Sequence, residues 1–233
     1  MSKSTKAANH QPDAVENIES ALNRSEEFIL KNRKSLGIIV SGILIAIALY
    51  MGFNKFYLTP LNDEAMLQMF VAEQYFEKDS FNMALKGDGI NAGFLEIADE
   101  YSITPSGNLA KYYAGISYLR LGQFEEAIAQ LKSFDSKDKM IGNIALGAIG
   151  DAYAELGNNK EAISYYNKAA ARVSNDFSSP IYLFRAGLLY EKEGQYDNAM
   201  KMYKKIQAEF PGSTEGRVIS KYIARIEALP KAN

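Results

Sequence analysis

The chain has 233 residues and a net charge of −2, and 47% of its residues are hydrophobic. Such a chain can bury a globular core, and its charge balance gives no sign of the basic surface that nucleic-acid binding requires. Cys is absent and the single His is His10, in a polar N-terminal tail, so disulfides, thiol catalysis, a His-based triad and a Cys- or His-ligated metal site are excluded.

Residues 1–34 predict a cytoplasmic tail that contains a short amphipathic helix. Val15, Ile18, Leu22 and Ile29 recur at helical spacing in this segment. The sequence leaves open whether this helix lies on a membrane or docks on a partner.

Residues 35–54, SLGIIVSGILIAIALYMGFN, carry no charge and predict a transmembrane helix. A helix of this length rises about 30 Å, the thickness of a hydrocarbon core. One alternative is a buried helix of a soluble domain, which usually has a shorter apolar run. Another is a signal peptide cleaved after Ala46-Ile47-Ala48. Against cleavage, the apolar run continues to Phe53 and the preceding segment is long for a signal.

The flanking charges predict the orientation of this span. Arg24, Lys31, Arg33 and Lys34 lie close before it, and only Lys55 lies close after it. The positive-inside rule then places the N-terminus in the cytoplasm and residues 58–233 in the periplasm. We therefore expect a single-pass protein of the bacterial inner membrane.

Small residues form a stripe along the predicted span. Gly37, Ser41, Ala48 and Gly52 fall on one side of the helix and would allow another membrane helix to approach closely. The alternative is that Gly and Ala are simply common in membrane helices.

Three segments of the C-terminal region align with one another: YYAGISYLRLGQFEEAIAQL, LGAIGDAYAELGNNKEAISYY and FRAGLLYEKEGQYDNAMKMY. Their first glycines are 35 and then 37 residues apart, close to the period of about 34 of tetratricopeptide (TPR) repeats, which are antiparallel helix pairs. The recurring small, aromatic and turn positions are Gly115, Tyr118, Gly122 and Ala127; Gly150, Tyr153, Gly157 and Ala162; and Gly187, Tyr190, Gly194 and Ala199. These are the signature positions of the TPR family, so we predict an all-α protein in which one transmembrane helix precedes a TPR-type solenoid.

The expected repeats cover residues 108–141, 143–178 and 180–213, after a degenerate repeat at about 65–107 that KGDGINAG interrupts. Residues 214–229 predict a final capping helix, with Val218, Tyr222, Ile223 and Ile226 on its apolar side.

A stacked solenoid offers a concave surface, and the TPR resemblance implies which side chains line it. The candidates are apolar and charged residues on the first helix of each pair: Met69, Glu73, Phe76, Tyr112, Ile116, Arg120, Asp151, Glu155, Phe184, Leu188 and Lys192. Such a mixture suits an extended or helical polypeptide. The alternative for each position is simple packing between neighbouring helices.

Nothing in the sequence favours catalysis. The carboxylates stand where helix surfaces and turns need solvation, and neither a phosphate-binding loop nor metal-ligand spacing is present. We therefore expect no enzymatic activity, no catalytic residue, no metal and no cofactor.

The whole layout resembles the ancillary subunit of the bacterial Sec translocon, an inner-membrane protein with a periplasmic TPR domain. EEFILKNRKSLGIIV (26–40), the aromatic-rich NKFYL (54–58) and the repeats that follow carry this resemblance. It implies a membrane-tethered scaffold or chaperone-like factor that binds translocon subunits, exported chains or periplasmic chaperones. A structural adaptor of a cell-envelope complex is the alternative, and self-association stays open.

Overall fold

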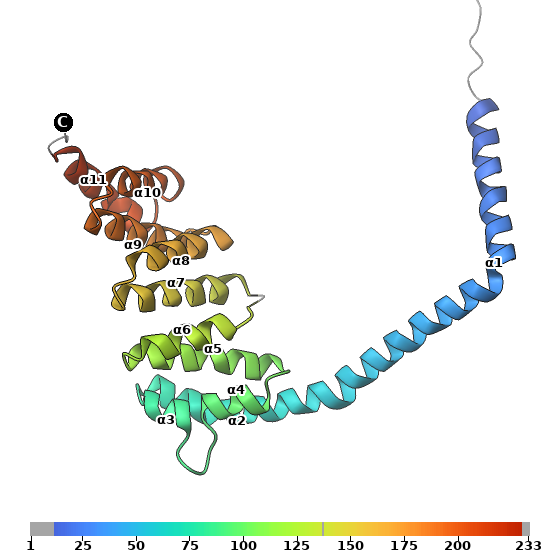
Figure 1. Cartoon of the computed structure of the whole chain (residues 1–233), viewed down its shortest axis with the longest axis horizontal. Helices are drawn as coiled ribbons and strands as arrows, with labels where there is room; N and C mark the ends of the chain where they lie inside the picture. Colours follow the sequence, from blue (N-terminus) through green and yellow to red (C-terminus); the bar gives the residue numbers. More distant parts are fainter. Residues whose placement is uncertain (1–11, 137, 230–233) are drawn as a thin grey trace, which may run out of the picture. The chain divides into compact units, whose positions relative to one another are not determined.

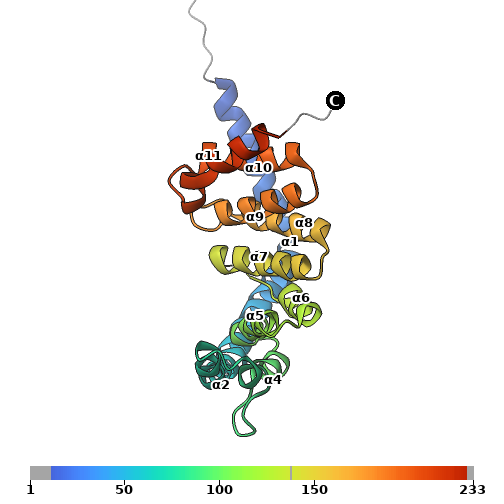
Figure 2. The same cartoon turned by 90° about the vertical axis from the view of Figure 1, so that its left-hand side faces the viewer.

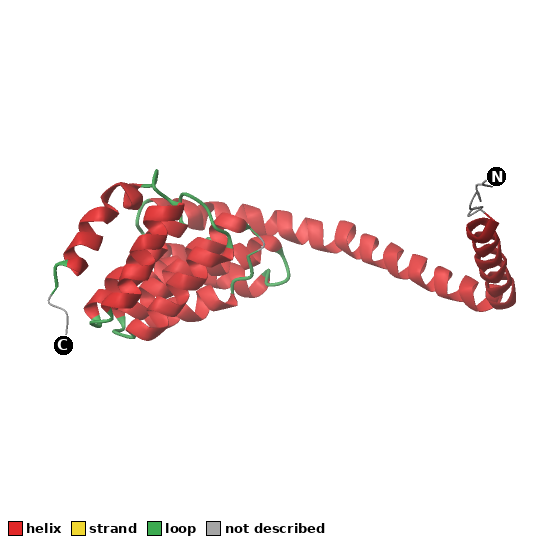
Figure 3. Ribbon diagram, turned by 90° about the horizontal axis from the view of Figure 1, so that it is seen from above, coloured by secondary structure: helices red, strands yellow, loops and turns green. Residues whose placement is uncertain are grey.

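The computed structural model describes residues 12–136 and 138–229, and within them only helices and loops occur (Figure 3). It divides into two compact units, one ending at Tyr57 and the other beginning at Leu58. The all-α class predicted from the sequence is confirmed. His10 and the rest of residues 1–11 lie outside the described residues.

The first unit contains one long helix, α1 (Pro12–Phe53). The predicted short amphipathic helix and residues 35–53 of the predicted span both lie within this one helix. Its apolar window has a mean hydropathy of 2.4 with none of it buried, so this helix is long and apolar enough to cross a membrane. Ile29 is exposed, whereas the side chains of Val15, Ile18 and Leu22 lie outside the described ones.

A five-residue π-helix, η1 (Asn54–Leu58), follows α1, and α2 (Thr59–Glu77) follows it without an intervening loop residue. Three features thus succeed one another along the chain: an apolar helix, a π-helical turn and the first helix of the second unit. π-helical turns of this kind occur mostly as local irregularities within longer helices.

The second unit is a stack of antiparallel helix pairs (Figures 1 and 2). The first pair is α2 with the broken second helix α3 (Phe81–Lys86) and α4 (Phe94–Glu100), which the glycine-rich loop 87–93 separates. Three regular pairs follow: α5 (Pro105–Arg120) with α6 (Phe124–Ser133), α7 (Lys139–Glu155) with α8 (Asn159–Arg172), and α9 (Ser179–Lys192) with α10 (Tyr196–Glu209). The last helix, α11 (Thr214–Glu227), lies against α9 and α10.

Each regular pair turns at a glycine with a left-handed backbone. Gly122, Gly157 and Gly194 have φ of +74°, +73° and +70°. Glycine reaches this region without the steric cost that a side chain imposes, and it is the usual residue just after a helix. The same residue therefore ends the first helix of all three pairs.

The two helices of each pair approach closely where the first helix has a glycine. A Cβ added at Gly115 would lie 2.5 Å from Leu131 Cγ, one at Gly150 2.6 Å from Tyr166 Cδ1, and one at Gly187 2.3 Å from Tyr203 Cε1. Each large side chain of a second helix therefore fills the space that the missing side chain leaves.

Side-chain caps fix several helix starts. The hydroxyl of Thr104 accepts a 3.0 Å hydrogen bond from the Gly107 amide, and Asp138 accepts bonds from the amides of Met140 and Ile141. Ser213 caps α11 in the same way as Thr104 caps α5. Such caps satisfy amides that have no partner inside the helix.

The buried apolar side chains of α11 differ in part from the prediction. Ile219 and Ile223 are buried, Tyr222 and Ile226 pack beside them, and Val218 is 48% exposed. Ile219 precedes Tyr222 and Ile223 by three and four residues and so shares their face of the helix, whereas Val218 lies at the edge of that face.

Candidate protein-binding cleft

A cleft of about 790 Å³ lies between α5 and α7 and extends to α8 and α9. Residues from five helices and one turn form its walls: Tyr112, Ile116, Leu119, Arg120, Gly122, Phe124, Ile144, Ala148, Asp151, Ala154, Glu155, Tyr166, Tyr182 and Arg185. It is therefore built by successive repeats and not by one repeat alone.

A network of three polar side chains closes the floor of the cleft. Tyr166 of α8 donates a 2.7 Å hydrogen bond to Oδ1 of Asp151 on α7, and Arg185 of α9 forms an ion pair with the same oxygen. Burial raises the pKa of Tyr166, and the negative charge of Asp151 raises it further. Tyr166 therefore remains a neutral donor, and the Asp151 carboxylate already has two partners.

Tyr166 of this network stacks on a second tyrosine of the cleft lining, Tyr182. The rings of Tyr166 and Tyr182 are stacked with centroids 6.2 Å apart, and the Arg185 guanidinium lies 5.9 Å from the Tyr182 centroid. Gly147 makes room for Tyr182, since a Cβ there would lie 2.0 Å from Cε1 of the ring. Burial raises the pKa of Tyr182 to about 12. The floor is therefore packed and its donors hold their protons at neutral pH.

The wall on the α5 side is aromatic and apolar. Tyr112 and Ile116 are half-buried, and the Tyr112 ring lies 5.4 Å from that of Phe134. Ile144 and Ala148 of α7 line the opposite side. An apolar wall that stays open to solvent can accept the apolar side chain of a ligand.

Two charged residues of opposite sign stand at the rim. Arg120, in the last turn of α5, and Glu155, at the end of α7, are both exposed. With the apolar wall and the fixed polar floor, this arrangement suits a polypeptide with an apolar anchor and polar neighbours. Within the described residues, no three His, Asp or Glu side chains gather as a metal site would need.

The structure places five of the predicted groove residues around this one cleft: Tyr112, Ile116, Arg120, Asp151 and Glu155. They come from the first helices of two neighbouring repeats. The other predicted residues lie elsewhere.

Residues of the degenerate repeat do not form an open groove. Met69 is only 3% exposed and packs in the core, because it faces inward with Ala65 and Ala72. Phe76 packs against the rings of Phe81, Phe94 and Tyr113, with centroids 5.2–6.2 Å apart.

Glu73 also lies against the neighbouring helix, because its carboxylate accepts a hydrogen bond from Tyr113 of α5. Partial burial raises the pKa of Glu73, and Glu77 contributes to the rise. Tyr113 of α5 therefore contacts both Phe76 and Glu73 of this repeat.

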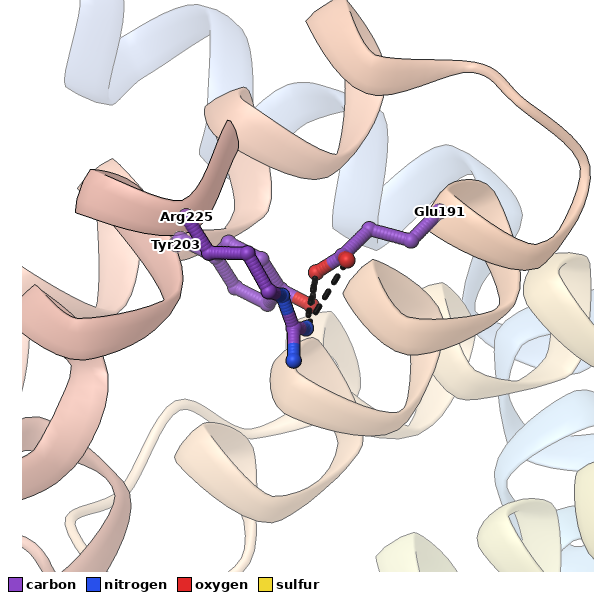
Figure 4. A network of polar contacts seen from close by, with 3 residues as sticks. All are labelled: Glu191, Tyr203 and Arg225. Atoms are coloured by element: carbon purple, nitrogen blue, oxygen red, sulfur yellow. Dashed lines mark hydrogen bonds and ion pairs between the residues drawn. The ribbon is translucent and has the colours of Figure 1, made fainter. Parts of the chain in front are cut away.

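In the last repeat, α11 covers part of the predicted groove. The ring of Phe184 meets that of Tyr222 edge-on, with centroids 4.8 Å apart. Nearby, Arg225 of α11 pairs with Glu191 of α9 at 2.8 Å (Figure 4). Phe184 is thus a packing residue, whereas Leu188 and Lys192 remain exposed outside the cleft.

Sequence reasoning missed several lining residues, of which Arg185 and Tyr182 are the most important. They precede Gly187 by two and five residues, while the predicted positions precede it by three or follow it. An Arg on an inner helix surface, one repeat after an Asp, was the available signal.

On α1, Gly37 and Ser41 lie with Ile38, Gly42 and Ile45 along a shallow groove. Ala48 and Gly52 are not part of it, and a Cβ at Gly37 or Gly52 would meet no atom within 4 Å. Packing of this face against another membrane helix stays a prediction.

Comparison with known proteins gives two matches. Residues 84–221 match the family described as "T7SS, ESX-1 secretion system protein EccA1, N-terminal domain". Tetratricopeptide repeat protein 29 of Macaca fascicularis is 24% identical over 151 residues, which cover 60% of this chain and 31% of that protein. The chain therefore spans about a third of that relative's length. With the stacked helix pairs, these matches show a TPR-like helical repeat domain, a kind that generally binds proteins and is not catalytic.

Proposed function

This chain belongs to the EccA1 N-terminal domain family of ESX-1 secretion systems, and from that premise we propose that it is a membrane-tethered scaffold whose α5–α7 cleft binds segments of other proteins. The observation that carries the proposal is the cleft itself. Its apolar wall is open, while its charged floor is already neutralised by internal partners. A ligand therefore gains apolar burial without having to desolvate an unpaired charge.

The proposed location is the bacterial inner membrane, close to the Sec translocon, with the repeat domain in the periplasm. The excess of Lys and Arg before the apolar segment and the resemblance of the layout to the translocon's ancillary subunit support this placement. A secretion-system protein in the name of the matched family agrees with a role in protein export. The ligands would be exported chains, periplasmic chaperones or translocon subunits.

Tethering has a physical advantage for a weak binder. A domain held near the exit of a channel meets emerging chains at a high effective concentration, so modest affinity at one cleft suffices. The polar groups of the floor already bond to one another, so the open apolar wall suits varied sequences better than one strict motif.

Site-specific photocrosslinking in intact cells tests this proposal. A photoreactive residue at Ile116, inside the cleft, should capture translocon subunits, chaperones or exported chains. The same residue at exposed Lys204 on α10 is the matched control and should capture far less. Capture of none of these from position 116 would count decisively against the proposal.

A substitution in the cleft wall provides a second test of the proposal. Ile116→Asp places an unpaired carboxylate on the apolar wall and should reduce capture from a photoreactive residue at Tyr112 about tenfold or more. A single partner that co-purifies in fixed ratio and is unaffected by this change would favour the structural-adaptor reading instead.

A further inference from the structure

The outer face of α2 is the most apolar exposed helix surface of the repeat unit. Met66, Leu67 and Phe70 are 57%, 76% and 61% exposed. They lie on the side of α2 opposite the buried Ala65 and Met69, since their spacing of one to four residues places them on one face.

Inside the stack, neighbouring repeats cover apolar faces of helices. Ala110 and Ala114 of α5, for example, are fully buried where α5 meets the α2–α4 repeat. Terminal repeats of solenoids ordinarily turn a polar face outward. α2 begins the repeat unit and departs from that rule, so its outer face resembles a surface that lacks its covering helix.

A second apolar group is presented by the same repeat, at the tip of loop 87–93. Ile90 is 93% exposed. The loop projects from the end of the stack opposite α11 in both Figure 1 and Figure 2.

Hydrogen bonds hold this loop in one conformation. Asp88 accepts bonds of 2.7 to 2.8 Å from the amides of Ile90 and Asn91, from the Asn91 side chain and from the hydroxyl of Tyr75. Tyr75 belongs to α2, so the loop is fastened to the helix that bears the exposed face. A fastened loop loses little entropy when a partner contacts its tip.

Charge identifies the kind of partner. α2 contains Asp63, Glu64, Glu73 and Glu77 and no Lys or Arg. Asp63 precedes Leu67 by one helical turn and Glu77 follows Phe70 by two, so carboxylates flank the apolar stripe on the same face. A second copy of α2 or an anionic lipid surface would add like charge, whereas a basic partner would be attracted.

We propose that the outer face of α2 is a second docking site that binds an amphipathic helix of another protein, and that Ile90 adds a contact from the loop that Tyr75 fastens to α2. The apolar stripe of that helix is flanked by Lys or Arg. It packs on Met66, Leu67 and Phe70, and its basic residues face Asp63 and Glu77. This site is separate from the α5–α7 cleft and does not depend on it.

The test uses the full chain in nanodiscs of phosphatidylcholine and two synthetic helical peptides with the same leucine stripe. One peptide carries flanking Lys residues and the other carries flanking Glu residues. The Lys peptide should bind about tenfold or more tightly than the Glu peptide, and added salt should narrow the difference.

Variants locate the binding. The double substitution Leu67→Ser with Phe70→Ser should lower the affinity for the Lys peptide about tenfold or more. Ile90→Ser should lower this affinity several-fold. Ile116→Ser in the cleft is the control and should leave the affinity for the Lys peptide unchanged. All three α2 and loop positions are exposed, so an unchanged thermal unfolding curve is expected and shows that the variants fold.

Equal binding of the two peptides, or binding of neither, overturns the proposal. The proposal is also overturned if the wild-type chain sediments as a dimer and the double variant sediments as a monomer, because a second copy of the chain would then occupy the face. If the wild-type protein binds phosphatidylglycerol vesicles and the double variant does not, the face binds lipid, and this result would also overturn the proposal. Full binding by Ile90→Ser overturns the role of the loop.

Discussion

The hydroxyl of Tyr203 donates a 2.6 Å hydrogen bond to Oε1 of Glu191, and Arg225 pairs with the same carboxylate at 2.8 Å. The arrangement repeats one unit earlier, where Tyr166 and Arg185 both bind Asp151. In each case the tyrosine comes from the second helix of a pair, the acid from the first, and the arginine from the helix that follows. A three-residue polar network therefore joins consecutive elements twice along the stack.

Arg225→Ala should loosen the docking of α11. The Glu191 side chain is 16% exposed and that of Arg225 is 49% exposed, so solvent weakens the pair. We expect the free energy of unfolding to fall by about 1 kcal/mol. Urea denaturation followed by circular dichroism measures it. Lys221→Ala, an exposed change on the same helix, should have a smaller effect, and equal losses would contradict the assignment.

Gly187→Ala should destabilise the last repeat. The new methyl would lie 2.3 Å from Cε1 of Tyr203, whose ring is fully buried and has no space to move into. Such overpacking costs about 1–3 kcal/mol. Gly212→Ala is the matched control, because a Cβ there meets no atom within 4 Å and its backbone is not left-handed. Similar melting temperatures for the two variants would show that the close approach of α9 and α10 at Gly187 does not contribute to stability.

Asp138 should make stability depend on pH. Hydrogen bonds from the amides of Ile141 and Met140 hold the pKa of Asp138 below its ordinary value. A lowered folded-state pKa means that the stabilisation is complete above about pH 4, the unfolded value, and is lost as the pH falls through the folded value. Asp138→Ala should therefore lower stability at neutral pH and reduce the loss on acidification.

Urea unfolding of both proteins from neutral to strongly acidic pH checks this. Two curves that remain parallel throughout would show that Asp138 does not stabilise α7 through its charge.

The proposed topology predicts the behaviour of reporter fusions in a bacterial host. Alkaline phosphatase fused after Asn233 should be active, because it folds only outside the cytoplasm, and a fusion after Lys34 should be inactive. An inactive fusion after Asn233 and an active fusion after Lys34 would place the repeat domain in the cytoplasm. This result would contradict the proposed periplasmic location, although the cleft could still bind protein.

Much of the fold was predictable because a repeated local rule builds it. A glycine turn, a glycine at the close approach of the two helices and a large side chain on the second helix recur in all three regular pairs, and each has a local physical cause. Gly157 ends α7 for the same reason that Gly122 ends α5.

The cleft was only partly predictable, because what fills a groove depends on neighbouring repeats. Tyr112 and Asp151 line it, whereas Met69 and Phe184, at comparable helix positions, are covered by core side chains and by α11. A period within the sequence identifies an inward position but not whether another element occupies it. The burial of Ile219 and the exposure of Val218 likewise depend on how α11 packs against α9 and α10.

The two ends of the repeat unit differ in what they can recruit. At the carboxyl-terminal end, α11 buries Ile219 and Ile223 and directs Arg217, Lys221 and Glu227 to solvent. At the opposite end, α2 exposes Met66, Leu67 and Phe70. The unit is therefore polarised: its last helix presents mainly charge, whereas its first helix presents mainly apolar surface.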